Sequence, residues 1–170
     1  AKSQALLRAA GYPPGKLVPV KVMLIPSGSG QMLAQPMNEL IQQSARKAGF
    51  DLKFESVDFS QAVAILRNKP MMDARGFQAA SMGFNTGDMT WVYYSFYPPN
   101  AVDFVDRPTM ELLDRYRNDF TDDQAGRDAL LARIHERLVD LAPWAWVVHD
   151  VNPRAFAPKV KGYTPTQTWF

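Results

Sequence analysis

The sequence has no cysteine among its 170 residues. A disulfide scaffold, a thiolate zinc site, an iron–sulfur cluster and a cysteine nucleophile are therefore excluded. A chain without thiols cannot mispair in an oxidising compartment, so the absence is compatible with export, but it does not name the compartment.

Strong charge of one sign and long apolar runs are also lacking. Nineteen Lys and Arg against 17 Asp and Glu give a net charge of +2, which is too small to drive sequence-independent binding to nucleic acid. The apolar runs, such as residues 144–148, are far shorter than a membrane span, and the amino-terminal residues have no signal-peptide pattern. We therefore expect no nucleic-acid partner and no membrane insertion by this segment.

What the sequence does contain is the patterning of a folded α/β domain, with 46% hydrophobic and 21% charged residues. Alternating or continuous apolar runs predict strands near residues 17–25, 50–57, 77–84 and 144–149. Apolar residues at helical spacing predict helices over residues 3–10, 31–48, 58–68, 109–119 and 121–142. Because helices separate the strands, we predict an α/β fold with a mostly parallel sheet of about four strands flanked by helices.

Capping residues refine these boundaries. Ser3 is expected to cap the first helix, Gly49 to stop the second in a left-handed conformation, and Asp58 or Ser60 to cap the third. Thr121 with Gln124 reads as a capping box for the last helix. Residues 69–76 are expected to be a loop and 152–170 an irregular tail, while 85–108 could not be assigned. With no repeat and no evident internal boundary, residues 1–170 are expected to form a single lobe.

Two patterns resemble catalytic motifs and fall short on detail. Gly28-Ser29-Gly30 lies between a strand and a helix, where a dinucleotide fold binds pyrophosphate, but Leu33 replaces the third glycine and Pro36 falls at the helix start. A plain turn is favoured, although its amides could still bind an anion or a polar ligand group. His135 and His149 lack the spacing of a metal motif. We therefore expect no catalytic residue, no metal site and no cofactor.

Residues 84–99 are different, because one carboxylate, Asp88, stands among many aromatic rings. The segment follows a predicted strand, and in open α/β sheets ligands bind at the carboxyl ends of strands. Rings that stack and an acid that fixes orientation would suit a small molecule with an amine or hydroxyl groups. The rings would equally well form a small core under a long loop, or an interdomain surface.

Several segments in this order resemble the C-terminal lobe of the family 5 extracellular solute-binding proteins, the peptide- and nickel-type receptors of ABC importers. They read "LLRAAGYPPGK", "NELIQQSARKAGFDLKFESVDF", "SMGFNTGD" and "RDALLARIHERLVDLAPWAWVVHDVNPRAFAPKVKGY". The resemblance covers about residues 1–163. It implies one lobe of a type II periplasmic binding protein, with residues 152–170 leading back toward the other lobe.

The resemblance also implies partners and a location. Family members are about three times longer, so this chain resembles a fragment whose N-terminal lobe is missing, and ligand would be held between the two lobes. The implied partners are that lobe, the importer's permease and a small-molecule ligand. The full-length parent would be periplasmic, or extracytoplasmic and membrane-tethered.

Residue by residue, the resemblance places the ligand's amino group at Asp88, in the loop after Gly83 and Phe84. We predict ligand contacts from Asp88, Phe84, Asn85, Trp91 and Ser29. Dipeptide binders carry an Arg in the loop that is Ser27 to Gly30 here, and no Arg is present. A peptide, an opine-like compound and a sugar-like solute therefore all stay open. The alternative is an α/β enzyme fragment that binds a phosphorylated ligand at residues 27–30.

Overall fold

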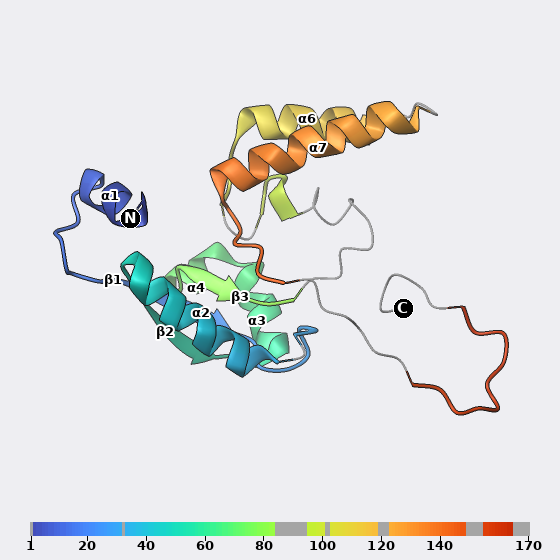
Figure 1. Ribbon diagram of the computed structural model, residues 1–170, viewed down its shortest axis with the longest axis horizontal. Coiled ribbons are helices and arrows are strands. Elements are labelled where there is room, and N and C mark those ends of the chain that lie inside the picture. The colour runs from blue at the N-terminus through green and yellow to red at the C-terminus, as the bar shows by residue number, and fades with distance from the viewer. Residues whose placement is uncertain are drawn as a thin grey trace. The chain divides into compact units, whose positions relative to one another are not determined.

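The computed structural model describes residues 2–31, 33–83, 95–100, 103–118, 123–148 and 155–164. The chain divides into two compact units, Ala1–Phe84 and Asn85–Phe170, shown in Figure 1. Each unit is described by itself.

The first unit is built on a parallel sheet. Its strands are β1 (Val18–Leu24), β2 (Phe50–Ser56) and β3 (Ala79–Ser81), in the order β2-β1-β3. Val18 pairs with Phe50, and Val22 pairs with both Phe54 and Ala79. The predicted α/β fold with a mostly parallel sheet is confirmed, with three strands in the described part of the chain.

Helices cover both faces of this sheet (Figure 1). The connection from β1 to β2 contains α2 (Ala34–Ala48), and the connection from β2 to β3 contains α3 (Phe59–Leu66) and α4 (Lys69–Ala74). The two connections run in opposite directions across the sheet because β2 and β3 flank β1 on opposite sides. Right-handed crossovers therefore place α2 on one face and α3 with α4 on the other.

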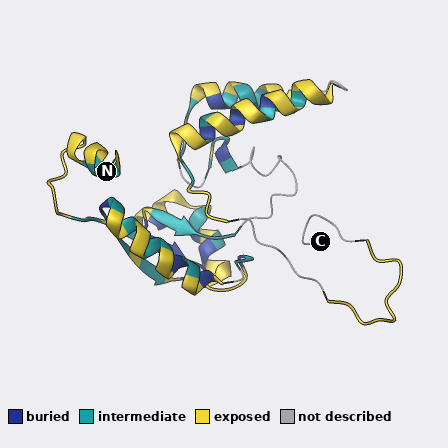
Figure 2. Ribbon diagram, in the orientation of Figure 1, coloured by how far each residue is buried: buried dark blue, intermediate teal, exposed yellow. Residues whose placement is uncertain are grey.

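The side chains of β1 alternate between the two faces of the sheet, so the strand contributes buried residues on each face. Met23 and Ile25 are fully buried with residues of α3, α4 and the segment before β3. Val22 and Leu24 point to the opposite face and are buried too. Burying strand residues on both faces explains why β1 reads as a nearly continuous apolar run. Figure 2 shows the buried residues within this layered unit and the exposed residues along the outer side of α2.

Two predicted helix ends are confirmed and one cap is wrong. Gly49 ends α2 in the left-handed region at φ 108°, and Asp58 caps α3 by accepting a hydrogen bond from the Ser60 N–H at 2.9 Å. The first helix exists as α1 (Lys2–Ala9), but Ser3 does not cap it. Its hydroxyl donates instead to the Ala48 carbonyl at 2.7 Å. The Ser3 side chain thus makes a tertiary contact with the end of α2, although the local sequence pattern predicted that it would cap α1.

The predicted loop at residues 69–76 is wrong, because it contains α4. Asn68 accepts a hydrogen bond from the Met71 N–H at 3.2 Å, and Pro70 lies in the first turn, where a missing N–H costs nothing. The predicted strand at 77–84 is shortened to β3 (Ala79–Ser81). Gln78 still extends the pairing, since its N–H donates to the Lys21 carbonyl at 3.0 Å.

The second unit contains α6 (Arg107–Asn118) packed against α7 (Gln124–Leu141). Both predicted helices are confirmed, with shifted starts. Asp123 caps α7 by accepting from the Gly126 N–H at 3.1 Å, while Thr121 lies outside the described residues. Asp106 accepts from the Thr109 N–H at 2.9 Å, so α6 begins two residues earlier than predicted. The core of the unit comprises Phe96, Leu113, Leu130, Ile134 and Leu138.

A fourth strand at 144–149 was predicted and is wrong for the described residues 144–148, which are irregular. Trp144 packs its ring on Phe96, with centroids 4.8 Å apart, and Trp146 packs on Trp144 at 5.1 Å. An apolar run cannot by itself distinguish a strand from a segment that docks aromatic rings on a core. The tail is irregular as expected over residues 155–164, the part that the structure describes.

Candidate functional site

The carboxyl ends of the three strands bring three loops together. Gly83, after β3, lies so close to the loop after β1 that an added Cβ would sit 2.5 Å from the Ser29 carbonyl oxygen and 3.3 Å from the Gln31 nitrogen. Gly28 lies close to α3, since an added Cβ would be 3.2 Å from that of Phe59. We call the described loops 26–31, 57–58 and 82–83 the carboxyl edge.

A chain of polar side chains runs across the carboxyl edge from β3 to α2. Gln31 donates through Nε2 to the Ser81 hydroxyl at 3.4 Å, and its Oε1 accepts from Asn38 Nδ2 at 3.4 Å. Asn38 Nδ2 also donates to the Ala34 carbonyl at 2.7 Å. Asn38 is only 2% exposed, whereas Gln31 and Ser81 are half-buried. The edge therefore offers amide and hydroxyl groups that a polar ligand could contact.

Among the predicted ligand residues, the structure describes Ser29. It lies at the carboxyl edge, is 3% exposed and donates from its hydroxyl to the Ile25 carbonyl at 3.3 Å. Its side chain thus closes the turn after β1, and a ligand contact there stays a prediction. Phe84, Asn85, Asp88 and Trp91 lie outside the described residues. They follow Gly83 directly in the sequence.

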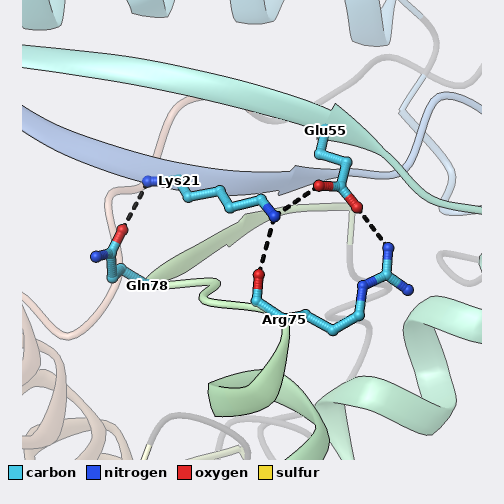
Figure 3. Close-up of polar contacts among 4 residues, drawn as sticks. All are labelled: Lys21, Glu55, Arg75 and Gln78. Atoms are coloured by element: carbon cyan, nitrogen blue, oxygen red, sulfur yellow. Dashed lines mark hydrogen bonds and ion pairs between the residues drawn. The ribbon is translucent and has the colours of Figure 1, made fainter.

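A second polar cluster lies on the sheet face that carries α3 and α4 (Figure 3). Lys21 Nζ pairs with Glu55 at 2.7 Å and donates to the Arg75 carbonyl at 2.9 Å, and the Arg75 guanidinium also pairs with Glu55. The Lys21 N–H donates to Gln78 Oε1 at 2.6 Å. Three of these residues border an open hollow of about 460 Å³, which is lined by Pro19, Lys21, Lys53, Phe54, Glu55, Gly76 and Gln78.

The charges of this second cluster are paired with one another. Lys21 and Arg75 lower the pKa of the Glu55 carboxyl, and Lys53 and Arg46 lower that of Asp51. The Lys21 ammonium also lies 4.7 Å from the centroid of the Phe77 ring. Lys21 and Arg75 share the single carboxylate of Glu55, so the cluster joins β2 to the segment before β3 and has an excess of one positive charge.

In the described part of the chain, no group of three or more His, Asp or Glu side chains could hold a metal ion. His135 is exposed on α7, and His149 lies outside the described residues. None of the described helices combines the length and apolarity that crossing a membrane requires.

Sequence reasoning missed Gln31, Asn38 and Ser81 as site residues. Asn38 did leave a signal, because it occupies the apolar stripe of α2 between Ala34 and Ile41. A buried polar residue at such a position calls for an explanation. Gln31 and Ser81 left none, since their contact joins residues 50 positions apart.

Comparison with known proteins identifies the family. The model of bacterial extracellular solute-binding proteins, family 5 middle, matches residues 1–104. No curated protein matches the chain. Among solved structures, a dipeptide binding protein from Pseudoalteromonas sp. SM9913 in complex with Met-Leu matches with a TM-score of 0.64 and 18% identity. NikA from Brucella suis in complex with Fe(III)-EDTA matches with a TM-score of 0.55 and 21% identity.

Both matches cover most of this chain but less than a third of the solved structure. The first covers 82% of this chain and 28% of the dipeptide binding protein, and the second covers 79% and 29%. The chain thus spans less than a third of either structure, and at these identities both show the fold. The family model matches more than half of the chain, and the parallel sheet with helices on both faces agrees with it. This chain belongs to the family 5 bacterial extracellular solute-binding proteins.

Proposed function

We propose that the chain is the C-terminal lobe of an ABC-importer receptor, which captures a small solute between this lobe and an N-terminal lobe. The partial coverage of the structural relatives supports the description as one piece of a longer receptor. The proposed parent works outside the cytoplasm with a permease, and this lobe supplies binding rather than catalysis. A peptide is one candidate solute, with opine-like and sugar-like compounds as the others.

The observation that carries the proposal is the contact of Gly83 with the loop after β1. Gly83 lies at the carboxyl edge beside Ser29 and Gln31. Ligands bind at this edge in α/β folds, and Phe84, Asn85, Asp88 and Trp91 follow Gly83 in the sequence, so the proposal assigns them to the ligand. In this proposal Asp88 pairs with the solute's amine or hydroxyl groups, while the aromatic rings form the walls.

The test is a titration of the isotopically labelled chain, followed by NMR, with Met-Leu, maltose, Fe(III)-EDTA and inorganic phosphate in turn. One lobe leaves about half of the contact area open to water, so we expect a dissociation constant of about 1 mM or weaker. The shifted amides should belong to residues 27–31 and 81–91. Asp88→Ala should weaken that binding at least roughly ten-fold, whereas Glu136→Ala, on the exposed side of α7, should not.

Other outcomes would contradict the proposal. Normal binding by Asp88→Ala would remove Asp88 as the anchor. Shifts confined to the hollow around Lys21, Lys53 and Gln78 would move the site to the sheet face. Shifts of residues 27–31 with phosphate alone would favour the enzyme alternative. Micromolar affinity in the chain alone would contradict a clamp that needs two lobes.

A further inference from the structure

We propose that Gln31 determines specificity at the carboxyl edge, that Asn38 positions it, and that together they select an uncharged amide or hydroxyl end of the solute over a carboxylate. This inference rests on the proposed function, because it assigns a ligand chemistry to the same edge. It concerns a different end of the solute from the one assigned to Asp88.

Asn38 is energetically unfavourable where it stands. Its side chain occupies a 2% exposed position on the apolar stripe of α2, and Oδ1 has no hydrogen-bond partner among the described residues. Leaving a buried acceptor unsatisfied is unfavourable, so an apolar residue would stabilise α2 better. Rotating the amide would not help, because Oδ1 would then face the Ala34 carbonyl that Nδ2 now meets at 2.7 Å. The residue therefore serves something other than the stability of its own helix.

Asn38 also fixes the orientation of the Gln31 side-chain amide. Asn38 Nδ2 donates to Gln31 Oε1, so the Gln31 amide must present Nε2 on its other side, where it donates to Ser81. Nε2 carries two hydrogens, and the described structure uses one of them. The second hydrogen and the Ser81 hydroxyl remain as donors at the half-buried surface. A carbonyl or hydroxyl oxygen of a solute would meet both.

The charge of the carboxyl edge also disfavours a carboxylate. The carboxyl edge has one ionisable side chain, Asp58, which already accepts from the Ser60 N–H. The following stretch, residues 84–94, contains no Lys or Arg and one acid, Asp88. A solute carboxylate would lose water at the described loops of this edge without gaining a cation from them, which is strongly unfavourable. An uncharged amide or hydroxyl pays a smaller desolvation cost and pairs with the donors that Gln31 and Ser81 present.

The test uses two small probes that differ only in this chemistry, acetamide and acetate, so that it does not depend on knowing the solute. Each is titrated at pH 7 into the full chain, and the side-chain amide signals of Gln31 are followed by NMR. We expect acetamide to bind at least roughly five-fold more tightly than acetate. Gln31→Met keeps the length and removes the amide, and it should weaken acetamide binding and so lower the ratio. Gln31→Arg should favour acetate.

Asn38→Leu separates positioning from folding. It should lower the acetamide preference while the remaining amide signals, and hence the fold, stay as in the wild type. Gln35→Met is the matched control, since Gln35 is exposed on α2 and its amide pairs with Glu39. It should leave the preference unchanged. A wild-type preference for acetate, no shift at Gln31 with acetamide, or an unchanged ratio in Gln31→Met would overturn the inference.

The two proposals fail differently. Solute binding at the carboxyl edge together with a preference for acetate would leave the proposed function standing and remove the role given to Gln31. Solute shifts confined to residues outside 27–31 and 81–91 would contradict the proposed site, and the inference would fall with it.

Discussion

The two units of this chain are stabilised in different ways. In the first, three parallel strands share backbone hydrogen bonds, and helices bury both faces of β1. In the second, two helices and an aromatic segment share one core, and Asp106 joins the start of α6 to α7 through two bonds to Arg137, of 2.6 and 2.7 Å. The first unit distributes its stability over a sheet, while the second concentrates it in a few side chains.

This contrast bears on function, because the described loops of the carboxyl edge lie in the first unit. A ligand edge held by a sheet keeps its loops in place while solvent and solute exchange around it. The second unit, in contrast, should respond strongly to single substitutions. The predictions below test that difference, beginning with the largest effect.

The largest effect should come from Ile134→Ala in α7. Ile134 is fully buried, and removing its side chain leaves a cavity, so we expect the second unit to lose about 3 kcal/mol of stability. Hydrogen exchange should show faster exchange across α6 and α7, with protection in β1 and β2 unchanged. Ile65→Ala, at a 1% exposed site in α3, is the reciprocal control and should act on the first unit. Equal loss of protection in both units from either variant would show that they unfold as one.

A smaller effect should follow from Asp106→Asn. Arg137, together with the Thr109 hydroxyl and N–H, holds the pKa of the Asp106 carboxyl well below its usual range. The substitution weakens these charge-assisted bonds, and we expect a loss of about 2 kcal/mol in thermal or denaturant unfolding. Arg107→Gln is the control, because its pair with Glu111 is 90% and 64% exposed and should contribute almost nothing.

The same carboxyl predicts a pH dependence for the second unit. Since folding lowers the Asp106 pKa, its contribution is complete above the ordinary Asp value of about 4 and is lost as the pH falls below it. Unfolding of the wild type should therefore become easier in that acidic range, by more than unfolding of Asp106→Asn. Parallel pH profiles for the two proteins would contradict this assignment.

The smallest effect is expected at the carboxyl edge, from Gly83→Ala. The added Cβ would lie 2.5 Å from the Ser29 carbonyl, and backbone must shift to admit it. We expect a loss of about 1 kcal/mol, with NMR shifts concentrated at residues 27–31 and 81–83. Gly126→Ala is the comparison, because its added Cβ would displace the end of the Asp123 side chain, the cap of α7, and should therefore shift the signals of α7 and not those of residues 27–31. Unperturbed signals at 27–31 would show that the two loops are not in contact.

The sequence predicted the elements whose signals are local. The apolar stripe and Gly49 located α2, and the alternation from Phe50 to Ser56 located β2, because each signal depends on neighbouring residues alone. Residues 144–148 were predicted wrongly, since packing on Phe96 involves a residue 48 positions away from Trp144. The polar chain at the carboxyl edge was missed for the same reason. The family could be recognised, but the pairing of Gln31 with Asn38 and Ser81 required coordinates.

Gly49 illustrates how two unrelated demands can meet at one position. Its φ of 108° suits the left-handed end of α2, and its missing side chain leaves room for α1, since a Cβ would lie 2.5 Å from Leu7 Cδ1 and 3.1 Å from Gln4 Nε2. Asparagine tolerates the left-handed backbone region, but its Cβ would collide with the side-chain ends of Leu7 and Gln4. A substitution at Gly49 would therefore have to hold the left-handed backbone and also displace the side-chain ends of Leu7 and Gln4 on α1.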